Sequence, residues 1–291
     1  MRMFGAVEAG GTKFVLAVGT AEGELVDVTE VPTKAPEDTL PAVVDYFRRY
    51  QLFALGVGSF GPLDLAPDSP SLGILTDTPK IEWRGTNIRL RLEREVGVPT
   101  YVTTDVAAAA LGELRRGEHG PLESCLYITV GTGIGAAFLL HGDIYSGMNH
   151  PEMGHISVRR APHDTFSGVC PAHGDCLEGM ASGPAIHARW GMPGQALPAE
   201  HEAWQMEAHY LAEAVVNYIY TFYPQRIILG GGVMRHPHLL GKVQEGVLER
   251  MRGYHVAPTV RSIQEYLVAP KLGPLSGVYG ALLLAIAGYR G

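Results

Sequence analysis

The chain has 291 residues, and 46% hydrophobic against 18% charged residues allow a sizeable buried core in one large or two medium domains. A formal net charge of -7 argues against a nucleic-acid partner, which normally requires a basic face. Three cysteines are too few for a disulfide framework. No signal-peptide core or run of about 18 apolar residues occurs, so we expect a soluble cytoplasmic protein with no membrane partner.

The first 31 residues predict three strands joined by two turns. The first turn contains Gly10, Gly11 and Thr12, with Lys13 beside it. Such a turn can present backbone N–H groups and a hydroxyl around a small concavity, and its glycines allow close approach of a phosphate. An ordinary glycine hairpin explains the same residues, so both interpretations stay open at this point.

The next segments predict a helix over 37–50 and then a buried strand that runs into a polar loop. Ser59 and Asp64 lie at the carboxyl end of this strand, where open α/β sheets bind ligands. An irregular, proline-containing stretch follows and ends at Asn87, which opens a helix. As a helix cap Asn87 needs no other function, although an asparagine could also hold a sugar hydroxyl.

Asp105 lies where a strand over 98–104 turns into an alanine-rich helix. One interpretation is structural, because an aspartate at a helix N-terminus satisfies free N–H groups. The other is functional, because a carboxylate at the carboxyl end of a strand is well placed as a general base.

Residues 125–147 repeat the opening pattern of strand, glycine turn and strand. The second turn contains Gly131, Thr132 and Gly133, about 120 residues after the first. Two such turns suggest two similar halves, each presenting one phosphate-cradling turn to a shared cleft. Neither turn fits the P-loop pattern or the Rossmann fingerprint.

The segment 151–183 gathers thiols, imidazoles and carboxylates. Its candidate metal ligands and acids are Glu152, His155, Cys170, His173, Cys176 and Glu178. The spacing C-x-x-H-x-x-C favours a tetrahedral metal site over a chance cluster of buried thiols and a surface histidine. The carboxylates that bracket this site indicate substrate chemistry nearby.

The last third predicts a long amphipathic helix that ends before Pro224, then a strand running into a glycine loop. That loop, Gly230, Gly231 and Gly232, could take a phosphate or the flat face of a ligand. A helix, a strand over 266–273 and an apolar closing helix with small residues suited to close packing complete the chain.

Together these motifs resemble the ROK family of sugar kinases, within the hexokinase–actin-like superfamily. EAGGTKF resembles the family's first phosphate turn and TVGTGIGAA its second, and GSFGPLDL, TDTPKIEWRGTNI and ILGGGVM match in order and spacing. The most specific element is PEMGH followed by CPAHGDCLEG, which resembles the family's zinc module in its fructokinase form.

The resemblance implies an α/β fold of the two-domain actin-like ATPase/hexokinase type, with duplicated mixed-sheet halves around a cleft. The first domain is expected over 1–113, with the closing helix 276–291 packed back on it. The second is expected over 114–275 and carries the zinc module 151–183. A homodimer is also expected, as in most of the family.

The resemblance further implies ATP-dependent, Mg²⁺-assisted transfer of a phosphoryl group to fructose O6, with Asp105 as the general base. A structural Zn²⁺ would be bound by His155, Cys170, His173 and Cys176. The sugar site would be lined by Asn87, Asp105, Glu152, His155 and Glu178. The ATP phosphates would be bound by Gly10, Gly11, Thr12, Lys13, Gly131, Thr132, Gly133, Gly230, Gly231 and Gly232.

Two positions depart from the family pattern: Glu8 replaces a frequent aspartate, and Thr104 replaces the asparagine that often precedes the base. Three other functions compete with the fructokinase hypothesis. They are a kinase for glucose, mannose or an N-acylhexosamine, a non-catalytic sugar sensor or repressor, and a zinc-folded interaction module.

Overall fold

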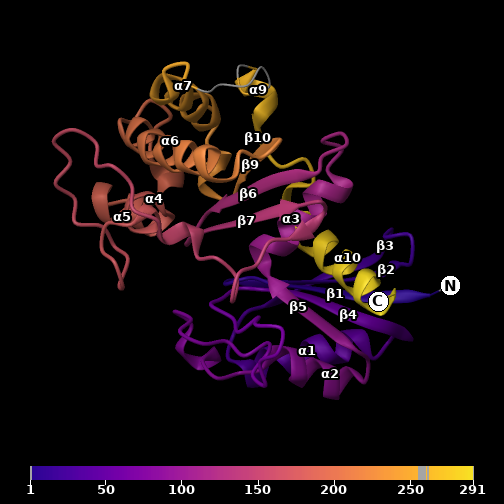
Figure 1. The fold of residues 1–291 in the computed structure, drawn as a ribbon. Helices are drawn as coiled ribbons and strands as arrows, with labels where there is room; N and C mark the ends of the chain where they lie inside the picture. The colour runs from indigo at the N-terminus through magenta and orange to yellow at the C-terminus, as the bar shows by residue number, and fades with distance from the viewer. Residues whose placement is uncertain (1, 255–259, 261, 291) are drawn as a thin grey trace. The chain divides into compact units, whose positions relative to one another are not determined.

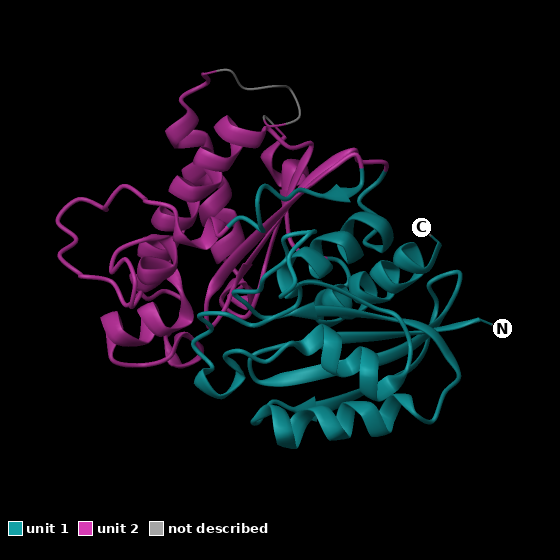
Figure 2. Cartoon of the chain, turned by 60° about the horizontal axis from the view of Figure 1, so that its bottom comes forward, with its two compact units in different colours: residues 1–120, 142–151, 271–291 teal, residues 121–141, 152–270 magenta. Residues whose placement is uncertain are grey.

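The computed structural model describes residues 2–254, 260 and 262–290, and its contacts divide the chain into two compact units. Unit 1 comprises residues 1–120, 142–151 and 271–291, and unit 2 comprises 121–141 and 152–270 (Figure 2). The sequence predicts one domain over 1–113 with 276–291 and a second over 114–275. This division stays a prediction, and residue 291 lies outside the described residues.

The sheet of unit 1 has the strand order β3-β2-β1-β4-β5. Its strands are β1 (Met3–Ala9), β2 (Lys13–Thr20), β3 (Leu25–Pro32), β4 (Leu52–Ser59) and β5 (Thr100–Thr104). The first three form an antiparallel meander, and β4 and β5 run parallel to β1. Ala9 is opposite Ser59, and Ser59 is opposite Thr104. The carboxyl ends of β1, β4 and β5 therefore meet at one edge of the sheet.

Helices cover both faces of this sheet (Figure 1). They are α1 (Pro36–Phe47), α2 (Ile88–Val96), α3 (Asp105–Arg116) and α10 (Ser276–Arg290), with the short turns η1 (Ile81–Trp83) and η5 (Gly273–Leu275). Strand β1 alternates between the faces. Its Val7 packs in the core that includes α1 and α2, and its Ala6 packs in the core that includes α10. This alternation follows from the two-residue period of a strand.

The closing helix α10 packs against α3 at backbone contact distance. A Cβ atom on Gly280 would lie 1.6 Å from the carbonyl oxygen of Ala108, so no larger residue fits there. The close packing predicted from the small residues of this helix is confirmed.

Unit 2 repeats the arrangement of strand hairpin and parallel neighbour. Its strands are β6 (Ser124–Val130), β7 (Ile134–Leu140), β9 (Arg226–Gly230) and β10 (Leu267–Val268), in the order β10-β9-β6-β7. The hairpin β6–β7 is antiparallel and β9 is parallel to β6, just as β1–β2 is antiparallel and β4 is parallel to β1. The predicted α/β fold with duplicated mixed-sheet halves is therefore confirmed. The short β8 (Asp143–Ile144) lies in the 142–151 segment of unit 1.

The helices of unit 2 bury one large hydrophobic core with this sheet. They are α4 (Leu177–Ala181), α5 (Gly183–Trp190), α6 (Ala203–Phe222), α7 (Leu239–Met251) and α9 (Ile263–Tyr266), with η2 (Met153–His155), η3 (Gly194–Ala196) and η4 (Val233–Arg235). The predicted long amphipathic helix is α6, which ends two residues before Pro224. Within the described ranges, no helix combines the length and apolar character needed to cross a bilayer.

Candidate active site and metal centre

Thr33 holds the first glycine turn through two hydrogen bonds. Its hydroxyl donates to the carbonyl of Gly10 at 2.7 Å, and its backbone N–H donates to the carbonyl of Thr12 at 3.0 Å. In the part of the chain that the structure describes, the N–H groups of Gly11 and Thr12 donate no hydrogen bond, and both residues are exposed. The turn therefore offers two adjacent donors to a ligand, as an anion-binding turn requires.

The side chain of Lys13 is engaged elsewhere. Its ammonium group forms an ion pair with Glu30 on β3, and both side chains are about half exposed. Binding of the ATP phosphates by Lys13 stays a prediction, and the structure pairs its charge with a neighbouring carboxylate.

Glu8 is the carboxylate of β1 closest to this turn. Burial, followed by the charge of Asp105, raises the pKa of Glu8 from its ordinary value to about 7. Lys13 and the backbone N–H of Val278 act in the opposite direction without cancelling the effect. One carboxylate oxygen of Glu8 is buried and lacks a hydrogen-bond partner. Glu8 is therefore a buried acid near the carboxyl edge of the unit 1 sheet, and the charge of Asp105 adds to the rise of its pKa.

Asp105 is the first residue of α3, directly after β5. The cap of this helix is Thr104, whose hydroxyl oxygen accepts a hydrogen bond from the N–H of Ala107 at 3.2 Å. Thr104 is therefore the N-cap, and Asp105, the first residue of the helix, still satisfies one free N–H group of the helix end, as the structural interpretation expects. Asp105 is partly exposed, and its Oδ1 accepts a hydrogen bond from the N–H of Val106 at 2.8 Å.

Two other polar residues predicted near a ligand are held in structural roles. Asn87 caps α2, because its Oδ1 accepts from the N–H of Leu90 at 2.9 Å and its Nδ2 donates to the carbonyl of Leu72 at 3.1 Å. The capping interpretation of Asn87 is confirmed. Asp64 accepts hydrogen bonds from the hydroxyls of Ser69 and Ser71, which lower its pKa.

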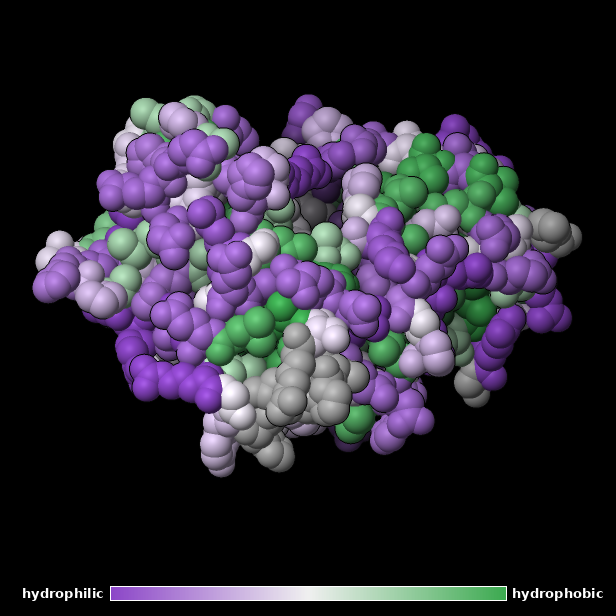
Figure 3. Space-filling view, turned by 90° about the horizontal axis from the view of Figure 1, so that it is seen from above, coloured by the Kyte–Doolittle hydropathy of each residue, from purple (hydrophilic) through white to green (hydrophobic). Residues whose placement is uncertain are grey.

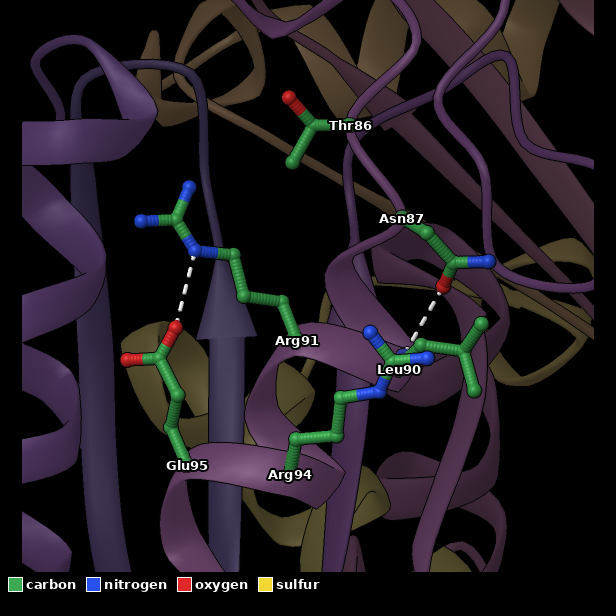
Figure 4. A pocket seen from close by; sticks show the side chains of 6 residues that line it. All are labelled: Thr86, Asn87, Leu90, Arg91, Arg94 and Glu95. Carbon is green, nitrogen blue, oxygen red and sulfur yellow. Dashed lines mark hydrogen bonds and ion pairs between the residues drawn. The ribbon is translucent and has the colours of Figure 1, made fainter.

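A pocket of about 440 Å³ opens beside α2 (Figure 4). Its lining residues are Thr86, Asn87, Leu90, Arg91, Arg94 and Glu95. Figure 4 shows the guanidinium of Arg91 bonded to Glu95, at 3.1 Å, and Arg91 also contacts Glu37. The pocket is lined by neither Asp105 nor the first glycine turn. We therefore take the carboxyl edge of the unit 1 sheet, where these residues lie, as the candidate site.

The second glycine turn and the triple-glycine loop lie side by side in unit 2. Thr129, near the end of β6, is opposite Gly230 in the ladder. Gly231 has a φ of 99°, and a Cβ atom there would lie 2.2 Å from the carbonyl oxygen of Val130. The carbonyl of Gly131 accepts a 2.7 Å hydrogen bond from the N–H of Gly183, at the start of α5. The structure thus brings together both predicted phosphate-binding segments of this unit.

Glu178 connects this edge to the metal-binding segment. Its Oε2 accepts a 2.9 Å hydrogen bond from the N–H of Ile134, which follows the second glycine turn. A Cβ atom on Gly133 would lie 2.7 Å from the same oxygen, so the glycine gives the carboxylate access to the turn. Its other oxygen, Oε1, lies 3.9 Å from Nε2 of His155.

His155, Cys170, His173 and Cys176 form a compact cluster whose ligand atoms all lie within 4.8 Å of one another. Nδ1 of His155 lies 3.6 Å from the sulfur of Cys170 and 3.5 Å from that of Cys176. Zn–S bonds of about 2.3 Å and Zn–N bonds of about 2.0 Å at tetrahedral angles separate sulfur from nitrogen by about 3.6 Å. The four side chains therefore fit a zinc ion. Glu152 is exposed at the start of η2.

A second anchor holds the same segment without a metal. Burial acts to raise the pKa of Asp164, but hydrogen bonds from Arg189 and Tyr210 outweigh it and lower this pKa to about 2. Arg189 donates to Asp164 at 2.6 Å, and its guanidinium lies over the ring of Phe166. The loop is therefore fixed to α5 and α6 at one end and by the Cys/His cluster at the other.

Comparisons with known proteins agree with this arrangement. The model of the ROK family matches residues 4–287. The chain is 40% identical to the fructokinase of Pediococcus pentosaceus, over 99% of each chain, and 38% identical to the fructokinase of Zymomonas mobilis, over 98% of this chain and 97% of the relative. The crystal structure of the ROK hexokinase from Thermus thermophilus superposes with a TM-score of 0.78, at 25% identity and 99% coverage of each chain. The chain therefore belongs to the ROK family and has its two-domain, actin-like hexokinase fold.

Proposed function

We propose that this protein is an ATP-dependent fructokinase, which transfers the terminal phosphoryl group of ATP to O6 of D-fructose. The observation that carries the proposal is the position of Asp105 at the carboxyl edge of the unit 1 sheet. Thr104, and not Asp105, is the N-cap of α3. The choice of fructose is supported by the two fructokinases at 38–40% identity over nearly the whole chain.

Asp105 acts as the general base in this mechanism. Its carboxylate accepts the proton of the sugar hydroxyl as that oxygen attacks the phosphoryl group. A positioned base typically contributes about 10²- to 10⁴-fold to the rate. The pKa of Glu8 is raised to about 7, in part by the negative charge of Asp105. An ionised Asp105 therefore favours the protonated form of Glu8 when no cation is bound.

The glycine turns supply hydrogen-bond donors to the phosphates. The N–H groups of Gly11 and Thr12 donate to no described residue in unit 1. In this proposal the segments 131–133 and 230–232 have the corresponding role in unit 2. Phosphoryl transfer depends on such positioning and electrostatic stabilisation more than on covalent chemistry. Mg²⁺ bound with ATP would neutralise phosphate charge, and in this proposal Glu8 would hold it through a bound water.

Zinc is structural in this proposal. Four protein ligands leave a tetrahedral ion without an open position, so it supplies no Lewis acid to the reaction. With Nδ1 of His155 directed at the thiols, its Nε2 is turned toward Glu178. Glu152, His155 and Glu178 are the proposed sugar contacts of this segment, and Asn87 has one amide hydrogen left for such a contact after capping α2.

A homodimer is part of the proposal. On the face drawn in Figure 3, hydrophilic residues predominate and hydrophobic ones form separate patches. Unit 2 exposes large aromatic side chains, with Tyr220 47% and Tyr254 74% exposed and their rings in edge contact at 6.2 Å. Such side chains are enriched at protein interfaces. Light scattering after size exclusion would give about twice the chain mass of 31.3 kDa for a dimer.

A hexose panel tests the proposed activity. Wild-type protein is assayed with ATP and Mg²⁺ against fructose, glucose, mannose and N-acetylmannosamine, and the position of the new phosphate is determined by NMR. The proposal predicts the highest kcat/KM with fructose and a phosphate on O6. A higher kcat/KM for another sugar would identify a different hexose kinase, and no transfer to any sugar would favour the sensor or interaction-module hypothesis.

A further inference from the structure

The first phosphate turn has a lysine against it that comes from a distant part of the chain. A Cβ atom built on Gly11 would lie 3.5 Å from Cε of Lys80, and no other described heavy atom outside the neighbouring residues lies within 4 Å of it. Gly11 is exposed and its N–H is one of the two available donors. The last carbon before the ammonium group of Lys80 therefore lies beside the turn that is proposed to hold phosphate.

The base of this side chain is held by packing. Nζ of Lys80 lies 6.0 Å from the ring centroid of Phe60, which packs edge-on against Trp83 at 5.5 Å. The indole N–H of Trp83 donates to the carbonyl of Lys34 at 2.8 Å, and the backbone N–H of Lys80 donates to the hydroxyl of Thr78 at 3.3 Å. At 6.0 Å this cation–π contact is at the outer limit of such interactions, so Phe60 orients the lysine without compensating its charge.

The two lysines near the turn differ in their charge partners. Lys13 is paired with Glu30, whereas Lys80 forms no ion pair with any residue in the described ranges. An ammonium group on a side chain beside two N–H groups that donate no hydrogen bond among the described residues complements an anion with several oxygens. The charge of Lys13, next to the turn in sequence, is compensated by Glu30. Lys80, in the loop before η1, has no such ion pair among the described residues and can therefore pair with an anionic ligand.

We propose that Lys80 binds an oxygen of the phosphoryl group that is transferred, together with the N–H groups of Gly11 and Thr12. This inference rests on the proposed function, because that phosphoryl group belongs to ATP before transfer and to the sugar phosphate afterwards. Lysine acts there as a compact point charge that stabilises the negative charge of the phosphoryl oxygens. A hydrogen bond to a charged group contributes about 1.5–3 kcal/mol, or roughly 10- to 150-fold in affinity.

The test compares three variants of the full-length protein with wild type by calorimetry. Lys80→Met keeps the packing stem and removes the charge, and Lys80→Arg keeps the charge. Lys34→Met is the matched control, an exposed lysine of the same unit that has no ion pair in the described ranges. The ligands are the ATP analogue AMPPNP with Mg²⁺, fructose 6-phosphate, and adenosine, which has no phosphate.

The proposal predicts that Lys80→Met weakens binding of AMPPNP, fructose 6-phosphate or both by at least about 10-fold, while adenosine binds as in wild type. A loss confined to AMPPNP assigns the contact to the nucleotide, and one confined to fructose 6-phosphate assigns it to the product. Lys80→Arg recovers most of the affinity, and Lys34→Met matches wild type. A thermal midpoint equal to that of wild type shows that Lys80→Met is folded.

Unchanged affinity of Lys80→Met for both phosphates overturns the inference, as does a wild-type protein that binds neither. An equal loss for adenosine also overturns it, because the lysine would then serve packing rather than phosphate. The two proposals fail separately. If wild type phosphorylates no hexose but Lys80→Met still loses affinity for AMPPNP, the proposed function fails and the phosphate contact stands.

Discussion

The carboxylate of Glu178 accepts a hydrogen bond from the backbone N–H of Ile134, with 2.9 Å between the two atoms. Glu178 is the second residue of α4, which begins immediately after the metal-cluster residue Cys176. The metal segment and the second glycine turn are thus connected by one short stretch of chain. Zinc binding and the geometry of that turn should therefore depend on each other in unit 2.

Replacing Glu178 should affect the nucleotide as well as the sugar. We expect Glu178→Ala to weaken AMPPNP binding by about 5- to 150-fold, because the N–H of Ile134 loses a charged acceptor worth about 1–3 kcal/mol. Glu178→Gln keeps an acceptor oxygen and should recover most of the affinity. Calorimetry measures both, with Glu245→Ala on the exposed side of α7 as the control. Wild-type affinity in Glu178→Ala would show that this hydrogen bond does not shape the turn.

Zinc should be present at one ion per chain and should stabilise the fold. Cys176→Ala removes one ligand, so it should abolish stoichiometric zinc and lower the thermal midpoint by about 5 °C or more, since metal affinity is coupled to folding. Cys125, buried in β6 outside the cluster, provides the control, because Cys125→Ala should keep its zinc. Elemental analysis and calorimetry measure these quantities. A fully stable, active protein without metal would exclude the structural role.

The raised pKa of Glu8 predicts how stability changes with pH. Its folded-state pKa of about 7 exceeds the ordinary value of 4.5, so the folded protein retains a proton that the unfolded chain releases between these values. Its contribution to the free energy of unfolding therefore falls as pH rises from about 4.5 to 7 and stays low above that. Glu8→Gln removes this titration. Without Mg²⁺ it should match wild type near pH 4.5 and exceed it at pH 8 by up to about 3 kcal/mol.

Urea unfolding at pH 4.5, 6 and 8 in the presence of a chelator measures the difference between Glu8→Gln and wild type. Other carboxylates titrate equally in both proteins and cancel in this comparison. A difference that stays constant across the three pH values would contradict the raised pKa of Glu8.

Local patterns in the sequence predicted the paired hairpins, the glycine turns and the metal cluster. These features depend on residues that are close in sequence, such as Cys170, His173 and Cys176. The strand-to-helix switch also placed Asp105 correctly at a sheet edge. Its role as a cap could not be decided from sequence, because Thr104 and Asp105 are both good capping residues and only the backbone angles select Thr104.

Features that depend on long-range packing were missed. The ion pair of Lys13 with Glu30 depends on the pairing of β2 with β3, which no local pattern reveals, and phosphate binding by Lys13 stays a prediction. Lys80 reaches the same turn through a loop 69 positions further on, which no periodicity reveals. The strand predicted over 266–273 is reduced to Leu267–Val268, because Pro270 cannot donate to a ladder and a turn follows.

The turnover of Asp105→Asn tests the central claim most directly. Asparagine keeps the size of the side chain but cannot accept the sugar proton as a base. The account predicts that kcat with ATP and fructose falls by about 100-fold or more, while AMPPNP and fructose bind within about threefold of wild type. Turnover equal to that of wild type would contradict the assignment of Asp105 as the general base.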